Sequence, residues 1–143
     1  MTIEKLLAED LILDEGVVLK PYKDHLGNLT FGIGRNVSAR TNWISEETAY
    51  QMLGEDVADT LRDCLKVFPD YYTWSESRQR AIGNMMFQLG RTRFLKFKKM
   101  VDAIQKKDWM KASEEVKDSN LYRDPATRKR AMRVIKLIQE IRE

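Results

Sequence analysis

The spacing of apolar residues along the 143-residue chain predicts a mostly helical protein with one short β segment. Apolar positions recur at helical spacing after Thr2 and as far as Gly16, which favours a first helix capped by Thr2 and ended by Gly16. Beyond Gly16 the pattern changes, and Pro21 excludes a helix interior. Residues 22–24 and 29–34, joined by a turn, are therefore expected to form a β-hairpin.

A second apolar stripe begins at Ser45, a predicted helix cap, and stops at Pro69. Its members are spaced for one face of a long helix: Ala49, Leu53, Val57, Leu61, Leu65 and Phe68. Cys64 falls one position off this stripe and is expected to be a small packed side chain. A helix of this length is able to link two lobes.

More helices are expected after Pro69. Thr73 and Glu76 have the spacing of a capping box, and the helix that follows them is expected to end at Gly90. Further apolar stripes predict helices over residues 94–104, 108–116 and 124–141, with Asp124-Pro125 as the N-cap and first residue of the last one. The fold class that this pattern indicates is α+β, mostly α.

The composition excludes several classes of site. With one Cys and one His, the chain cannot supply the ligands of a Cys/His metal site or form an internal disulfide. Uncharged runs are too short to span a bilayer, which needs about twenty apolar residues, so no stable membrane insertion is expected. Residues 1–10 lack the basic-then-apolar pattern of a secretory signal, which predicts a protein that starts in the cytoplasm.

Charge is divided unevenly between the two halves of the chain. Residues 1–77 contain 7 Lys/Arg and 14 Asp/Glu, whereas residues 78–143 contain 18 and 8. A basic half attracts any polyanion, including nucleic acid, an anionic membrane surface or an anionic cell-wall polymer. Charge alone therefore leaves these partners open, and a nucleic-acid-binding helical protein is one alternative, although no groove-reading motif accompanies the basic residues.

Three polar residues flank the predicted hairpin in a way that suits acid/base chemistry. Glu15 ends the first helix, Asp24 ends the first strand and Thr30 lies early in the second. If residues 25–29 form the connection, Asp24 and Thr30 lie directly opposite, with Cβ atoms about 5 Å apart, and can hold one water between them. The same face continues to Gly32, where a bulky substrate meets bare backbone.

Glu15 and Asp24 are expected to carry different protonation states. A helix C-terminus carries about half a negative charge, which disfavours a second anion and makes the protonated form of Glu15 more available. Asp24, on an open hairpin, is expected to stay ionised. Two carboxyl groups in unlike environments are what general acid/base catalysis requires.

The ordered set of these residues resembles a known family. The motifs D-E-G at residues 14–16, L-K-P-Y-K-D at 19–24 and T-F-G-I-G at 30–34 look like the active-site segment of the bacteriophage-type lysozymes, glycoside hydrolase family twenty-four. Residues 84–90, 107–109 and 119–128 resemble later segments of that family, so the likeness covers nearly the whole chain. One departure is Arg35, which stands where many relatives carry His.

The resemblance implies a muramidase that hydrolyses the β-1,4 bond between N-acetylmuramic acid and N-acetylglucosamine in peptidoglycan. Glu15 matches the general acid, Asp24 the carboxylate that activates or orients water, and Thr30 the residue that helps to place that water. The matching substrate-binding positions are Gly32, Asn36, Phe87, Gln88 and Arg128, and Arg128 resembles a basic residue that pairs with the catalytic Glu.

The resemblance also implies a single lysozyme-like domain over residues 1–143. A hairpin lobe of about residues 15–45 is expected to join a helical lobe, residues 1–14 plus 60–143, through a linking helix of about residues 45–68. The expected protein is a monomer with no cofactor, metal or nucleic-acid partner, and it acts on the wall after release from the host bacterial cytoplasm. The alternative is a non-catalytic lysozyme-like domain that binds peptidoglycan or a protein.

Overall fold

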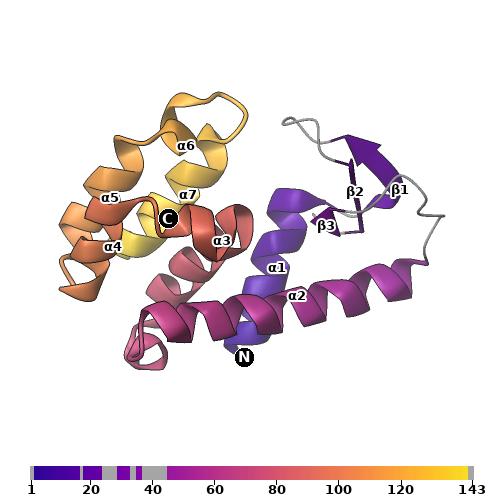
Figure 1. The fold of residues 1–143 in the computed structure, drawn as a ribbon, viewed down its shortest axis with the longest axis horizontal. Helices are drawn as coiled ribbons and strands as arrows, with labels where there is room; N and C mark the ends of the chain where they lie inside the picture. Colours follow the sequence, from indigo (N-terminus) through magenta and orange to yellow (C-terminus); the bar gives the residue numbers. More distant parts are fainter. Residues whose placement is uncertain (1, 17, 24–28, 33–34, 37–44, 142–143) are drawn as a thin grey trace. The chain divides into compact units, whose positions relative to one another are not determined.

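The computed structural model describes residues 2–16, 18–23, 29–32, 35–36 and 45–141 (Figure 1). The chain divides into two compact units, Met1–Asp59 and Thr60–Glu143, and the boundary falls inside one continuous helix, α2 (Glu46–Val67). Across the described ranges, no helix has both the length and the apolar character that a membrane crossing requires.

Helix α1 (Ile3–Glu15) has the two ends that the sequence predicts. Thr2 Oγ1 accepts a hydrogen bond from the backbone N–H of Lys5 at 3.2 Å, which satisfies one of the free donors of the first turn. Gly16 ends the helix at φ 72°, and its N–H donates to the carbonyl of Ile12 at 2.9 Å. The helix therefore stops directly after Glu15.

Three antiparallel strands follow, in the order β1 (Val18–Lys23), β2 (Leu29–Gly32) and β3 (Arg35–Asn36). Strand β1 begins earlier than predicted and passes through Pro21, with an irregular register between Val18 and Tyr22. Proline has no N–H for the ladder and is tolerated on an edge strand or at a bulge, and β1 is an edge strand. Strands β1 and β2 overlap the two predicted arms at residues 22–23 and 29–32, and β3 lies beyond the predicted hairpin.

Helix α2 begins after Ser45, whose Oγ accepts a hydrogen bond from the N–H of Thr48 at 3.0 Å, as a capping residue does. The buried stripe differs from the prediction at one position, because Cys64 is fully buried and Leu65 is only half-buried. The stripe that the structure buries is Ala49, Leu53, Val57, Leu61, Cys64 and Phe68. The expected packing of Cys64 is confirmed.

The predicted capping box at Thr73 and Glu76 is wrong. Helix α3 (Glu76–Phe94) is capped by Ser75, whose side chain accepts from the N–H of Arg78 at 3.4 Å. Thr73 belongs instead to a short 3-10 turn, η1 (Tyr71–Thr73), and its hydroxyl donates to the carbonyl of Asp70 at 2.6 Å. A side chain that closes its own turn is not available to cap the next helix.

Gly90 interrupts α3, at φ 73° and ψ 158°, before helical hydrogen bonds resume as far as Phe94. The prediction of a helix over residues 94–104 is therefore wrong at its start. Phe94 closes α3, and α4 (Lys98–Gln105) begins four residues later. The apolar spacing is continuous through the junction because both Phe94 and Met100 are buried, although they belong to different helices.

The C-terminal helices are α5 (Trp109–Lys117), α6 (Asn120–Arg123) and α7 (Arg128–Gln139). Asp108 caps α5 through a 3.1 Å hydrogen bond from the N–H of Lys111. The predicted start of the last helix at Asp124 is wrong, because the carboxylate of Asp124 accepts from the N–H of Ala126 at 2.9 Å and forms a turn. Helix α7 begins after that turn.

Helix α7 packs on α3 and α5, and α5 packs on α4, which encloses the core of the unit Thr60–Glu143 (Figure 1). An aromatic cluster extends this core. Phe68 lies 5.2 Å from Trp74 and 6.0 Å from Phe94, and Trp74 lies 5.0 Å from Trp109, all measured between ring centroids. Tilted and edge-to-face pairs of this kind add about 0.5–1.5 kcal/mol each beyond simple burial.

Candidate active site

Glu15 is the last residue of α1 and is half-buried. The residue after it, Gly16, lies at φ 72° and ψ 175°, a backbone conformation that is essentially restricted to glycine. The carboxyl group is thus carried on a helix end whose direction is fixed by the Gly16 cap. The predicted placement of Glu15 at a helix C-terminus is confirmed.

The strand register changes the expected pairing of Thr30. Thr30 in β2 lies opposite Tyr22 in β1, and Lys23 lies opposite Leu29. The prediction that Thr30 lies opposite Asp24 is therefore wrong, because the pairing is displaced by two residues along β1. Asp24 itself lies outside the described residues.

The sheet brings together two of the predicted site positions. Strand β2 pairs with β3 on the side away from β1. There Thr30 lies opposite Asn36, so these two residues are direct cross-strand partners. Gly32 lies at the far end of β2, opposite Val18. The backbone of the short sheet therefore brings three predicted site positions together. Thr30 and Gly32 lie in the four-residue strand β2, and Asn36 lies in the neighbouring strand β3.

A second group of predicted site residues lies on helix α3. Phe87 and Gln88 are half-buried, directly after the buried Met85 and Met86. Asn84 lies one turn before Gln88, on the same side of the helix, and is only 3% exposed. Asn84 and Gln88 therefore form a polar row beside the apolar core.

An arginine from α7 contacts this row, and Arg128, the arginine named from the family resemblance, makes different contacts. Arg130 Nε donates to Oδ1 of Asn84 at 2.8 Å, and Arg130 is half-buried. Arg128 is exposed and donates to two backbone carbonyls at 2.8 Å, those of Tyr122 and Arg123.

Asn84 and Arg130 were missed as candidates in the sequence. Asn84 is a polar residue inside the apolar stripe of a predicted helix, and this signal could have indicated it as a candidate. No comparable signal distinguishes Arg130 from Arg128, because which of the two arginines meets Asn84 depends on how α7 packs against α3.

Residues 13–130 match the phage lysozyme family. The chain belongs to this family. The matched segment contains Glu15, the three strands, and both Asn84 and Arg130. The family assignment therefore covers every residue that the sequence and the structure single out as a site candidate.

Curated relatives agree with the family. The chain is 34% identical to the pre-baseplate central spike protein Gp5 of Enterobacteria phage T4, over 92% of this chain. It is 28% identical to two Dictyostelium discoideum proteins, probable T4-type lysozymes 2 and 1, over 93% of both chains. The chain spans about a quarter of the spike protein's length and nearly the full length of the two lysozymes.

Proposed function

We propose that this member of the phage lysozyme family is a muramidase that hydrolyses the β-1,4 bond between N-acetylmuramic acid and N-acetylglucosamine in peptidoglycan. The observation that carries the proposal is Glu15, a half-buried carboxyl residue at the end of α1, inside a family match that covers residues 13–130. Two relatives named as probable T4-type lysozymes, matched along nearly their whole length, support the same activity.

In this mechanism the two carboxyl groups have opposite tasks. Protonated Glu15 donates its proton to the glycosidic oxygen while the bond from that oxygen to the sugar C1 breaks. Ionised Asp24 accepts a proton from a water that attacks C1, and Thr30 helps to place this water. The products are one new reducing end and one free hydroxyl. Asp24 then releases its proton to solvent and Glu15 takes up a proton from solvent, which restores the starting state.

The other site residues are proposed to hold the glycan chain. Gly32 and Asn36 supply the sheet side of the site, and Phe87 and Gln88 supply the helical side. The proposed architecture is a hairpin lobe and a helical lobe joined by α2. Arg128 is proposed as a basic residue of the site, and Asn84 with Arg130 as a further polar support.

The distance between the two carboxyl groups determines the stereochemical outcome. An inverting enzyme needs about 6.5–9.5 Å between them to admit a water, whereas about 5 Å indicates a retaining enzyme with a covalent intermediate. We propose the inverting arrangement, because in the mechanism above a water, and not Asp24 itself, attacks the sugar C1.

The experiment is a measurement of new reducing sugar ends released from isolated peptidoglycan. Glu15→Gln is expected to lose nearly all activity, since Gln has no proton to donate. Glu9→Gln is the matched control, because it makes the same substitution at an exposed position of the same helix. Equal activity in the Glu15→Gln and Glu9→Gln variants would remove Glu15 from the mechanism.

Asp24→Asn tests the second carboxyl group. This variant is expected to lose most of its turnover while its circular dichroism stays native, because Asn has nearly the size of Asp and the substitution removes the charge. Unchanged turnover in a natively folded variant would refute the role of Asp24. Peptidoglycan binding without any release of reducing ends by the unaltered chain would instead favour a non-catalytic binding domain.

A further inference from the structure

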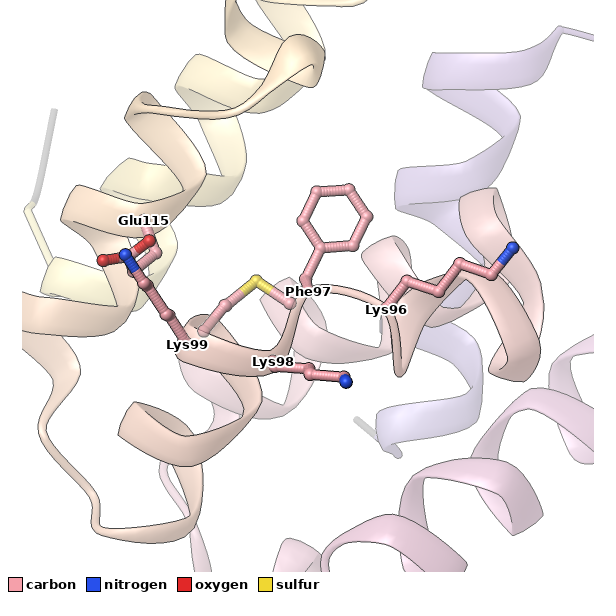
Figure 2. Close-up of a pocket in the computed structure, with 6 residues that line it drawn as sticks. Lys96, Phe97, Lys98, Lys99 and Glu115 are labelled. Carbon is pink, nitrogen blue, oxygen red and sulfur yellow. The ribbon is translucent and has the colours of Figure 1, made fainter.

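A hollow of about 320 Å³ opens beside the junction between α3 and α4, within the unit Thr60–Glu143. We call it the lysine hollow. Three lysines line it together with two apolar residues and one acid: Lys96, Lys98, Lys99, Phe97, Met100 and Glu115. Figure 2 shows Lys96 and Lys98 extending to one side of Phe97, and Lys99 extending to the other side toward Glu115.

Pairing of the cations in this region is uneven. In the described part of the chain, three cations of the basic stretch 91–107 have a carboxylate partner: Arg91 with Asp63 at 3.5 Å, Lys106 with Asp102 at 3.0 Å and Lys107 with Asp70 at 2.9 Å. The other four are exposed and have no carboxylate within 4.0 Å among the same described residues: Arg93, Lys96, Lys98 and Lys99. Three of these four line the hollow.

The acid in the lining does not cancel this charge. Glu115 already pairs with Lys111 at 3.2 Å, and its side chain is only 20% exposed. Of the three lysines of the hollow, only Lys99 extends toward this carboxylate, which already has Lys111 as a partner. The lining has three lysines against one glutamate, so its net charge is positive.

The start of α4 adds to the same potential. Its N-cap is Phe97, which cannot accept a hydrogen bond from the free N–H groups of the first turn, and that turn contains no acid. Lys98 and Lys99 instead place two positive charges at the positive end of the helix dipole. An anion in the hollow would relieve this repulsion.

We propose that the lysine hollow binds phosphate groups of an anionic polymer of the bacterial envelope. Lysines are compact point charges that suit phosphate oxygens, and three of them within four residues suit a polyanion better than a single small carboxylate. The choice of an envelope polymer rests on the proposed function, which brings the chain to peptidoglycan. The phosphate chemistry rests on the hollow alone.

Nucleic acid is the less favoured source of phosphate here. Proteins that bind single strands pair a basic groove with several aromatic side chains on which successive bases stack. Phe97 is the aromatic residue among those that line the hollow, and it is half-buried. A polymer that carries phosphate without bases fits this lining better.

The first test is an amide-shift titration of the isotope-labelled chain with inorganic phosphate, which replaces chloride at constant ionic strength. Saturable shifts are expected at residues 96–100. The combined variant Lys96→Gln, Lys98→Gln and Lys99→Gln is expected to bind phosphate at least about tenfold more weakly, because it loses the contacts that neutralise the anion.

The matched control removes the same charge elsewhere. The combined variant Lys106→Gln, Lys117→Gln and Lys129→Gln replaces three exposed lysines outside the hollow and is expected to keep its affinity within about twofold. Circular dichroism confirms the fold of both variants. Equal weakening in both would overturn the proposal, because it would show that net charge rather than the hollow attracts the anion.

The second test identifies the source of the phosphate. The unaltered chain is sedimented on ice with peptidoglycan sacculi, before and after removal of their phosphate polymers with hydrofluoric acid. Removal is expected to lower the bound fraction several-fold for the unaltered chain and for the control, but not for the hollow variant. Equal sedimentation before and after removal would overturn the envelope assignment, as would a DNA oligonucleotide that displaces the polymer at equal phosphate concentration.

These outcomes separate the two proposals. If the chain binds phosphate in the hollow but releases no reducing ends from peptidoglycan, the proposed activity is refuted and the phosphate site is supported. If the chain releases reducing ends and sediments equally with both kinds of sacculi, the envelope polymer is refuted as the partner and the proposed activity is supported.

Discussion

Arg130 in α7 donates a 2.8 Å hydrogen bond from Nε to Oδ1 of Asn84 in α3, and Asn84 is buried. The two residues are 46 positions apart in the sequence, so the bond joins two helices that pack against each other. A hydrogen bond from a charged donor to a buried amide is worth more than an ordinary surface contact. It also fixes the polar row that continues to Gln88.

A double-mutant cycle measures this bond. Asn84→Ala and Arg130→Ala are each expected to destabilise the fold, and the coupling energy between them is expected to be about 1.5–3 kcal/mol in urea unfolding. The control cycle pairs Asn84→Ala with Arg128→Ala, because Arg128 donates to the carbonyls of Tyr122 and Arg123 instead. A coupling no larger than that of the control would contradict the assignment.

Two glycines are expected to be intolerant of a side chain for a purely conformational reason. Gly16 and Gly90 both have φ above 70° and ψ near 160–175°, and a Cβ atom at either position would meet no other atom within 4 Å. Alanine at each is expected to cost about 1–3 kcal/mol through backbone strain. Gly54 also has open space, but it lies inside α2, where alanine is expected to stabilise by about 0.5–1 kcal/mol.

Urea unfolding of the three single variants checks this expectation. The opposite signs for Gly54→Ala and for the other two are the decisive result, since all three substitutions add the same methyl group to open space. Stabilisation by Gly16→Ala would show that the helix does not end after Glu15 as described.

Cys64 is expected to be chemically silent in the folded protein. Burial raises the pKa of its thiol to about 12, and the reactive form of cysteine is the thiolate. Reaction with a thiol reagent such as dithionitrobenzoate at pH 8 is therefore expected to occur at the rate of unfolding and to accelerate sharply in urea. Immediate reaction in native buffer would show that Cys64 is accessible.

Asp70 is expected to make a small contribution to the free energy of unfolding that depends on pH in the acid range. Hydrogen bonds from Lys107 and Trp74 lower the pKa of its carboxyl group below the ordinary value. Because the pKa of Asp70 is lower in the folded chain than in the unfolded chain, this stabilisation is complete at a pH above the unfolded-state pKa. It is lost as the pH falls through the folded-state pKa. The group is exposed, so the effect is expected to be below about 1 kcal/mol.

Comparison of the unaltered chain with Asp70→Asn at several pH values tests that sign. The unaltered chain is expected to be the more stable at pH 7, and the difference is expected to vanish in strong acid, where Asp70 is protonated. A difference that stays constant between pH 7 and pH 2 would exclude Asp70 as its source.

Local signals predicted the helices well where the cap is a single side chain next to its helix. Thr2 and Ser45 each accept the expected backbone hydrogen bond, and Gly16 ends α1. The prediction was wrong where a polar residue had a competing local partner. Thr73 and Asp124 both bond within their own turns, which moves the starts of α3 and α7.

The sequence predicted the candidate site only where the position of a residue depends on its immediate neighbours in the chain. Glu15 depends on one helix end, and its position is confirmed. The partner of Thr30 depends on strand register, which the length of the connection did not determine, and Arg130 depends on the packing of α7 against α3. Register and helix packing arise from tertiary contacts that a single sequence does not display.

Mass analysis of the fragments released from isolated peptidoglycan tests the central claim most directly. The unaltered chain and the Glu9→Gln control are expected to release glycan fragments with new reducing ends and with intact peptide and amide bonds. Glu15→Gln is expected to release nearly none. Fragments cut at peptide or amide bonds, or equal release by the Glu15→Gln variant, would contradict the account.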